Sequence, residues 1–206
     1  MNLTFQKSLS TPYNNNSQKI RAMSEPWTEQ NIFCPNCGNF LDWLENNKKV
    51  SDFLCGNCEE NYEQKASKKR FWWKVLASEY FTLIKRISAV DKPNFFFLHY
   101  IDLEYSVENF FVVPKYFFTS EIIEKRKPLS KTAKRAGWTG SNILFNKIPN
   151  SWKIYYVEDW KEISKEKILE KWQKTVFLKD IKKDSLKGWI LDIMNCIESL
   201  NKEKFS

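Results

Sequence analysis

The chain of 206 residues contains a single histidine, His99. Nucleases and zinc hydrolases that need two or more histidines are therefore excluded. His99 lies in an aromatic run, where we expect it to be packed rather than catalytic. The sequence also has no GxxxxGK[ST] phosphate-binding loop and no GxSxG nucleophile motif. These absences exclude several common hydrolytic sites.

Long apolar runs are absent as well. No run approaches the roughly 18 residues of a membrane-spanning helix. The first residues, MNLTFQKSLSTPYNNNSQK, lack the apolar centre of a secretory signal. We therefore expect a cytoplasmic protein with no membrane partner.

The composition suits one folded domain with a basic surface. Apolar residues make up 42% of the chain and aromatic residues 16%, which can supply a core. The formal net charge is +8 at pH 7. A basic balance favours a polyanionic partner, most often nucleic acid.

Apolar periodicity predicts an α/β fold, with helices interleaved with apolar strands. Helices are expected from Ser24 to Ile32 and over 72–87, 163–177 and 186–200. Strands are expected over 94–103, 109–113 and 153–157. Residues 1–17 are expected to be mobile. Residues 119–142 form a long basic connection of the kind that is usually functional or disordered.

Four of the five cysteines form two CxxC pairs separated by seventeen residues: Cys34, Cys37, Cys55 and Cys58. Without an export signal, such pairs are typical of metal ligands rather than disulfides. Four thiolates complete a tetrahedral zinc shell, which indicates a structural site. Gly38 and Gly56 would supply the backbone freedom that such turns need. The fifth cysteine, Cys196, is expected to pack within its helix.

Acidic residues flank the second CxxC pair. If residues 50–54 and 62–65 form a hairpin whose turn is the CGNC segment, Asp52 faces Glu63 at about 5 Å between Cβ atoms. Lys65 shares that face of the strand. Two opposed carboxylates destabilise a hairpin unless a cation compensates them. Asp52, Glu63 and the Gln64 carbonyl could bind magnesium.

An aspartate followed after about ten residues by Glu-x-Lys resembles the PD-(D/E)xK nuclease pattern. In that interpretation Asp52, Glu63 and Lys65 are catalytic: the metal activates a water and Lys65 orients the resulting hydroxide and stabilises the developing negative charge. The pattern also recurs by chance in chains rich in lysine and glutamate. A solvated, charged hairpin is the alternative.

The chain resembles the DpnI/Dam-replacing family of methyl-directed type II restriction endonucleases. The resemblance covers nearly the whole chain and rests on strings in a consistent order: Ser17-Gln18-Lys19, CPNCG at 34–38, Asp52-Phe53, Glu63-Gln64-Lys65, NFFFL at 94–98, RKPL at 126–129, TAKRAGW at 132–138, Gly188-Trp189 and Asn195-Cys196-Ile197. It implies a PD-(D/E)xK fold, in which a mixed central sheet is flanked by helices, with an inserted four-cysteine zinc site.

The resemblance also implies a magnesium-dependent enzyme that cuts duplex DNA at GATC when the adenine is methylated. It carries the catalytic set onto Asp52, Glu63 and Lys65, and the zinc set onto the four cysteines. Trp138 matches an aromatic residue that reads the methylated adenine, although it could instead anchor its loop. Basic residues nearby would bind phosphates or form ordinary surface: Arg126, Lys127, Lys131, Lys134 and Arg135.

One departure from the family concerns the C-terminus. Residues 1–182 would form the nuclease domain, with the zinc site at 34–58, and 183–206 a helix left from a winged-helix domain. The apolar stripe of that helix would pack on the nuclease domain, pair with another chain, or mark a truncated gene. We favour a monomer. Two alternatives stay open: a non-catalytic, zinc-stapled DNA-binding remnant, and a nuclease of different site specificity.

Overall fold

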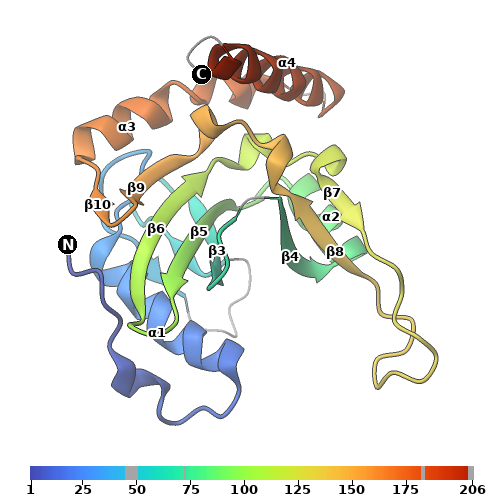
Figure 1. The fold of residues 1–206 in the computed structure, drawn as a ribbon. Coiled ribbons are helices and arrows are strands. Elements are labelled where there is room, and N and C mark those ends of the chain that lie inside the picture. Colours follow the sequence, from blue (N-terminus) through green and yellow to red (C-terminus); the bar gives the residue numbers. More distant parts are fainter. Residues whose placement is uncertain (45–50, 72, 182–183, 204–206) are drawn as a thin grey trace. The chain divides into compact units, whose positions relative to one another are not determined.

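A computed structural model describes residues 1–44, 51–71, 73–181 and 184–203. The chain divides into two compact units. The first contains Met1–Arg70, Pro93–Pro114 and Ile154–Val176. The second contains Phe71–Lys92, Lys115–Lys153 and the chain from Phe177 onward. Both units mix helices and strands, as expected for an α/β protein (Figure 1).

The first unit is built on a curled, mixed sheet of seven strands in the order β1-β2-β3-β5-β6-β9-β10. Their bounds are β1 Asp42–Trp43, β2 Phe53–Leu54, β3 Asn61–Ser67, β5 Asn94–Ile101, β6 Ser106–Val113, β9 Ile154–Glu158 and β10 Lys161–Glu162. Strands β3 and β5 run parallel, and the other neighbours run antiparallel. The central strands lie side by side in Figure 1.

The helices α1 (Asn16–Asn31) and α3 (Lys165–Gln173) belong to this unit and help to bury its core. Phe96 of β5 stacks on Tyr62 of β3, with ring centroids 4.6 Å apart. Trp27 of α1 lies 5.6 Å from Phe110 of β6, and Trp172 of α3 is also buried in this core. Each buried aromatic side chain contributes about 2–3 kcal/mol, so this packing fixes β3 firmly against its neighbours.

The second unit contains a three-stranded sheet in the order β4-β8-β7 and two helices. The bounds are β4 Lys74–Glu79, α2 Tyr80–Ser88, β7 Ile123–Lys125, β8 Gly140–Leu144 and α4 Asp184–Glu203. The Glu79 carboxylate accepts a hydrogen bond from the Thr82 N–H and caps α2. Leu83 and Ile87 form the buried side of that helix. None of the described helices is both long and apolar enough to cross a membrane.

Two predictions for the N-terminal part were wrong. The first helix begins at Asn16, not Ser24, because the Asn15 side chain accepts a hydrogen bond from the Ser17 N–H and caps it. Ser24 lies inside the helix and is buried. Residues 1–17 are also held more closely than predicted, since Phe5 is buried beside Trp27 and Tyr100.

The prediction of a helix over 72–87 is wrong for the first half of that range and confirmed for the second. Residues 74–79 form β4, and only 80–88 are helical; Trp72 lies outside the described residues. The strand follows from its pairing, because Val75 pairs with Ile143 and is buried while Leu76 faces solvent. The remaining helices and strands are confirmed within a few residues at each end.

Candidate active site and metal centre

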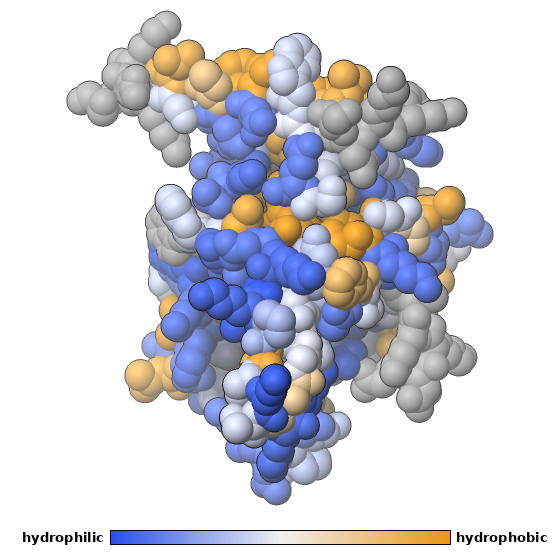
Figure 2. All heavy atoms as spheres, turned by 90° about the vertical axis from the view of Figure 1, so that its right-hand side faces the viewer, coloured by the Kyte–Doolittle hydropathy of each residue, from blue (hydrophilic) through white to orange (hydrophobic). Residues whose placement is uncertain are grey.

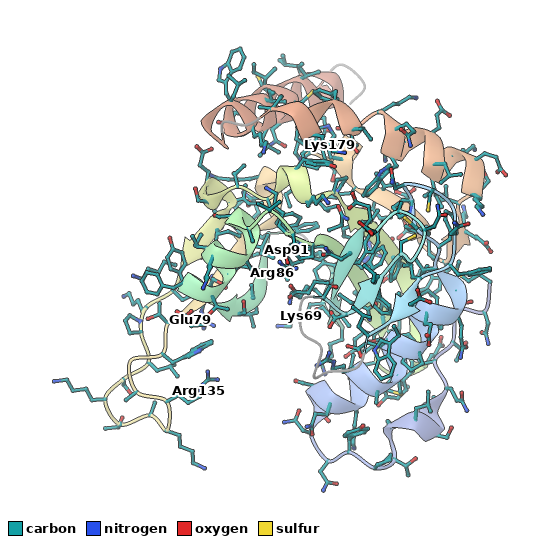
Figure 3. All side chains as sticks on the ribbon, turned by 180° about the vertical axis from the view of Figure 1, so that it is seen from behind. Lys69, Glu79, Arg86, Asp91, Arg135 and Lys179 are labelled. Atoms are coloured by element: carbon teal, nitrogen blue, oxygen red, sulfur yellow. The ribbon has the colours of Figure 1, made fainter. Side chains whose placement is uncertain are left out.

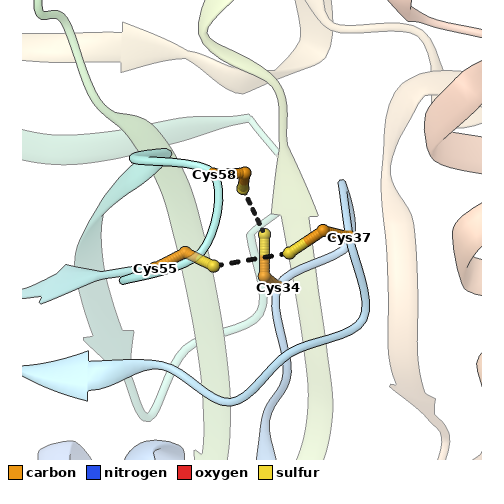
Figure 4. A group of neighbouring side chains, drawn as sticks. All are labelled: Cys34, Cys37, Cys55 and Cys58. Atoms are coloured by element: carbon orange, nitrogen blue, oxygen red, sulfur yellow. Dashed lines mark hydrogen bonds between the residues drawn. The ribbon is translucent and has the colours of Figure 1, made fainter.

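The four predicted zinc ligands come together in one cluster. The ligand atoms of Cys34, Cys37, Cys55 and Cys58 all lie within 4.8 Å of one another (Figure 4). The Sγ atoms of Cys34 and Cys58 are 3.5 Å apart, and those of Cys37 and Cys55 are 3.4 Å apart. A tetrahedral zinc ion with Zn–S bonds of about 2.3 Å requires sulfurs about 3.8 Å apart. The cluster is therefore compatible with zinc.

The two CxxC turns share one backbone design. The Gly38 N–H donates to the Cys34 carbonyl at 2.7 Å, and the Glu59 N–H donates to the Cys55 carbonyl at 2.9 Å. Each of these donors is four residues beyond its cysteine and has a left-handed backbone, with φ of 77° at Gly38 and 59° at Glu59. The expectation for Gly56 was wrong, because a glutamate holds the left-handed position in the second turn.

The cysteine cluster contacts the strand that carries the acidic residues. The Tyr62 hydroxyl, on β3, lies 3.1 Å from the Cys34 sulfur, and Tyr62 is fully buried. Burial raises the pKa of Cys34, and the hydrogen bond with Tyr62 opposes that shift. For Cys37, burial has the same effect, but hydrogen bonds from Asn39 and Asn57 outweigh it and lower the pKa to about 7. A bound metal would deprotonate those of the four cysteines that are still protonated.

The predicted hairpin register is confirmed for the two residues of β2, but the structure does not pair Asp52 with Glu63. Phe53 pairs with Tyr62, and Leu54 pairs with Asn61. The Asp52 N–H donates to the Tyr62 carbonyl at 2.9 Å, one residue away from the partner that this register would give it. The strand before the turn is shorter than predicted, since β2 contains only Phe53 and Leu54, and Val50 lies outside the described residues. Asp52 precedes β2, and the charge of Glu63 contributes to the electrostatics of the Asp52 carboxyl, so the two acidic side chains lie near each other.

Cationic side chains compensate both carboxylates in this structure. Lys65 is ion-paired with Glu63 on the same strand, and Arg21 lies 3.1 Å from Asp52. Burial raises the pKa of Asp52; the hydrogen bond from the Gln64 N–H opposes this shift and the charge of Glu63 adds to it. Carboxylate oxygens are ligands that hard divalent cations prefer, but here each carboxylate already has a cationic partner.

Gln64 presents its backbone, and not its side chain, to Asp52. Its side-chain oxygen accepts from the Thr28 hydroxyl at 2.6 Å, and its side-chain nitrogen donates to the Ser24 hydroxyl at 3.0 Å. Its backbone N–H donates to Asp52 Oδ2 at 2.7 Å. The N–H and C=O of one strand residue point to the same edge. The Gln64 carbonyl therefore lies on the Asp52 side of β3, as its predicted role requires.

Sequence reasoning missed a third acidic side chain near Asp52 and Glu63. Glu25 is buried on α1, where its carboxylate accepts from Arg21 Nε at 2.5 Å and from Trp43 Nε1 at 2.9 Å. Burial raises the pKa of Glu25; the hydrogen bond from Arg21 opposes this, and the charge of Asp52 adds to it. The four-residue spacing of Arg21 and Glu25 was the sequence feature from which this acidic side chain could have been predicted.

The basic connection in the second unit is an ordered hairpin rather than a disordered loop. The Arg126 N–H donates to the Gly140 carbonyl at 3.0 Å, and the Leu129 N–H donates to the Trp138 carbonyl at 2.9 Å. Five predicted DNA-contacting residues on it are all exposed: Arg126, Lys127, Lys131, Lys134 and Arg135. Figure 3 labels Arg135 on this hairpin. No acidic residue occurs between Glu124 and Glu158, so the hairpin is strongly basic.

Trp138 packs at the base of this hairpin. The Arg135 guanidinium lies 4.6 Å from the centre of its ring. A Cβ atom added to Gly140 would come within 2.8 Å of the same ring. The ring is therefore enclosed between an arginine and a glycine backbone, yet it is only half-buried. Both earlier interpretations of Trp138, as a loop anchor and as a base-reading group, are compatible with this position.

Three smaller predictions can be compared with the structure. His99 is packed as expected: it is buried, and its Nδ1 atom lies 2.5 Å from a Glu108 oxygen. Cys196 was expected to be packed, but it is exposed on α4. The apolar stripe of α4 is exposed as well and includes Trp189 and Leu200. Hydrophobic residues gather along the top of Figure 2, where α4 lies in Figure 1.

A comparison with protein families agrees with this arrangement. The family model DpnI, described as the Dam-replacing family, matches residues 1–181. The chain belongs to the Dam-replacing family. Membership of the DpnI family implies a restriction endonuclease that acts on DNA. The match includes both CxxC turns, the hairpin between β2 and β3, and the basic hairpin, and it ends before α4.

Proposed function

We propose that this Dam-replacing family protein is a type II restriction endonuclease that hydrolyses duplex DNA at a GATC-like site with a methylated adenine. The observation that carries the proposal is the acidic hairpin, in which the charges of Asp52 and Glu63 interact and Lys65 is ion-paired with Glu63 on the same strand. Together with the family match, this arrangement supports a PD-(D/E)xK nuclease fold.

In the proposed reaction, Asp52, Glu63 and the Gln64 carbonyl would hold magnesium. The bound metal would lower the pKa of a water and neutralise charge on the phosphate. Lys65 would give up its ion pair with Glu63 to orient the attacking oxygen. As the new P–O bond forms and the leaving P–O bond breaks, the Lys65 ammonium would stabilise the added negative charge.

The cysteine cluster would hold a structural zinc ion with no catalytic part. Four thiolates leave no open position for a water or a substrate. Cys55 and Cys58 form the turn between β2 and β3. Zinc bound there would therefore fix the hairpin that carries Asp52 and Glu63.

The basic hairpin would supply DNA contacts. Its five exposed cations would bind phosphates, which position the protein without reading sequence. Trp138 would provide an apolar surface for the adenine methyl group, much as apolar side chains contact a thymine methyl. We further propose a monomer that acts in the cytoplasm.

Two plasmid preparations test this function. The purified chain, with magnesium, is incubated with the same plasmid from an adenine-methylating host and from a host that lacks the methylase. We expect cleavage of the methylated plasmid only, and loss of that cleavage in a Lys65→Ala variant. Cleavage of both plasmids would favour a nuclease of different specificity. Undiminished cleavage by Lys65→Ala would contradict the assigned site.

One observation favours a second function. Asp52 and Glu63 already have cationic partners without a metal, namely Arg21 and Lys65. The same arrangement would stabilise a non-catalytic, zinc-stapled module that binds methylated DNA. Tight binding of methylated duplex with no magnesium-dependent cleavage would identify that function.

A further inference from the structure

Arg21 joins two acidic side chains from different parts of the first unit. Its Nε donates to Glu25 on α1 at 2.5 Å, and one terminal nitrogen donates to Asp52 Oδ1 at 3.1 Å. Glu25 is only 5% exposed, and Trp43 binds its second oxygen. The Arg21 guanidinium therefore donates one hydrogen bond to Glu25 and another to Asp52, and so lies between the two carboxylates.

Both oxygens of Asp52 are engaged in this arrangement. Oδ1 accepts from Arg21, and Oδ2 accepts from the Gln64 N–H at 2.7 Å. The hydrogen bond from the Gln64 N–H comes from the backbone of the core strand β3, so we expect it to persist when a metal binds. The bond to Arg21 comes from a side chain that is 46% exposed, so it is the contact that can be exchanged.

We propose that Arg21 is a latch that occupies Asp52 while no metal is bound and must release Oδ1 when a divalent cation binds there. The inference rests on the proposed nuclease site and adds a regulatory residue to it. Glu25 keeps the released guanidinium at the site, because its bond to Nε does not involve Asp52. The latch lowers the affinity of the site for metal, since the cation has to displace a positive charge.

Metal binding without DNA separates this latch from a merely structural role. The probe is Mn²⁺, titrated calorimetrically into the zinc-loaded protein in the absence of DNA. The wild type is compared with Arg21→Met, with Lys19→Met as a control that removes a charge from the same helix, and with Asp52→Asn. If Arg21 had only a structural role, the Arg21→Met variant would bind Mn²⁺ less tightly than the wild type. If Arg21 is a latch, the variant binds Mn²⁺ more tightly.

We expect Arg21→Met to bind Mn²⁺ about twofold to fivefold more tightly than the wild type, as loss of one competing ion pair implies. Lys19→Met should match the wild type. Unchanged or weaker binding by Arg21→Met overturns the latch. If Asp52→Asn or Glu63→Gln binds Mn²⁺ as well as the wild type does, the proposed metal site itself fails, which is a separate result.

Discussion

The left-handed residue of the second CxxC turn permits a quantitative test. Glu59 has φ of 59°, a conformation that costs a residue with a side chain about 1–2 kcal/mol. Glycine avoids that cost but loses about 0.5–1 kcal/mol of additional chain entropy on folding. We expect Glu59→Gly to stabilise the protein by about 0.5–1 kcal/mol.

Thermal unfolding of the zinc-saturated protein measures this difference. For a chain of this size, about 1 kcal/mol shifts the midpoint by about 2–4 °C. Glu59→Ala is the matched control, because it removes the carboxylate but keeps the Cβ atom, and it should give no gain. Gly38→Ala should be destabilising, since Gly38 holds the same position in the first turn. Equal midpoints for Glu59→Gly and Glu59→Ala would refute the backbone argument.

Three further predictions concern the cysteine cluster and the basic hairpin. Tyr62→Phe removes the hydroxyl beside the Cys34 sulfur, so a chelator should extract zinc several times faster; an unchanged rate would show that this contact is not needed. Gly140→Ala should displace the Trp138 ring and lower the affinity for methylated duplex, measured by fluorescence anisotropy, whereas unchanged affinity would remove Trp138 from methyl recognition. Lys134→Gln should weaken binding of methylated and unmethylated duplex equally and reduce its salt dependence; a selective effect would contradict a phosphate contact.

The local features of the acidic hairpin could be predicted from the sequence. A CGNC turn between two short apolar segments fixes which residues oppose each other, because strand pairing proceeds one residue at a time from the turn. The pairing of Phe53 with Tyr62 follows from that rule. The aromatic strand β5 could be predicted for a similar reason, since a buried central strand is apolar throughout.

Features that depend on tertiary contacts could not be predicted. The Leu76 position fits a helical pattern, yet pairing of β4 with β8 makes it a strand residue. Arg21 and Glu25 reach Asp52 only because α1 packs beside β3, and the hydrogen bonds of Ser24 and Thr28 to Gln64 hold it there. The left-handed backbone of Glu59 could not be predicted either, because nothing in the neighbouring sequence indicates that a glutamate adopts it.

We propose that zinc bound by the cysteine cluster fixes the hairpin that carries the proposed catalytic residues. Cys55→Ser removes one ligand from the turn between Asp52 and Glu63. The direct measurement is cleavage of methylated plasmid by this variant, at a temperature where circular dichroism shows that it remains folded. We expect loss of bound zinc together with loss of cleavage. Full activity in a zinc-free, folded variant would show that the cluster and the active site are independent.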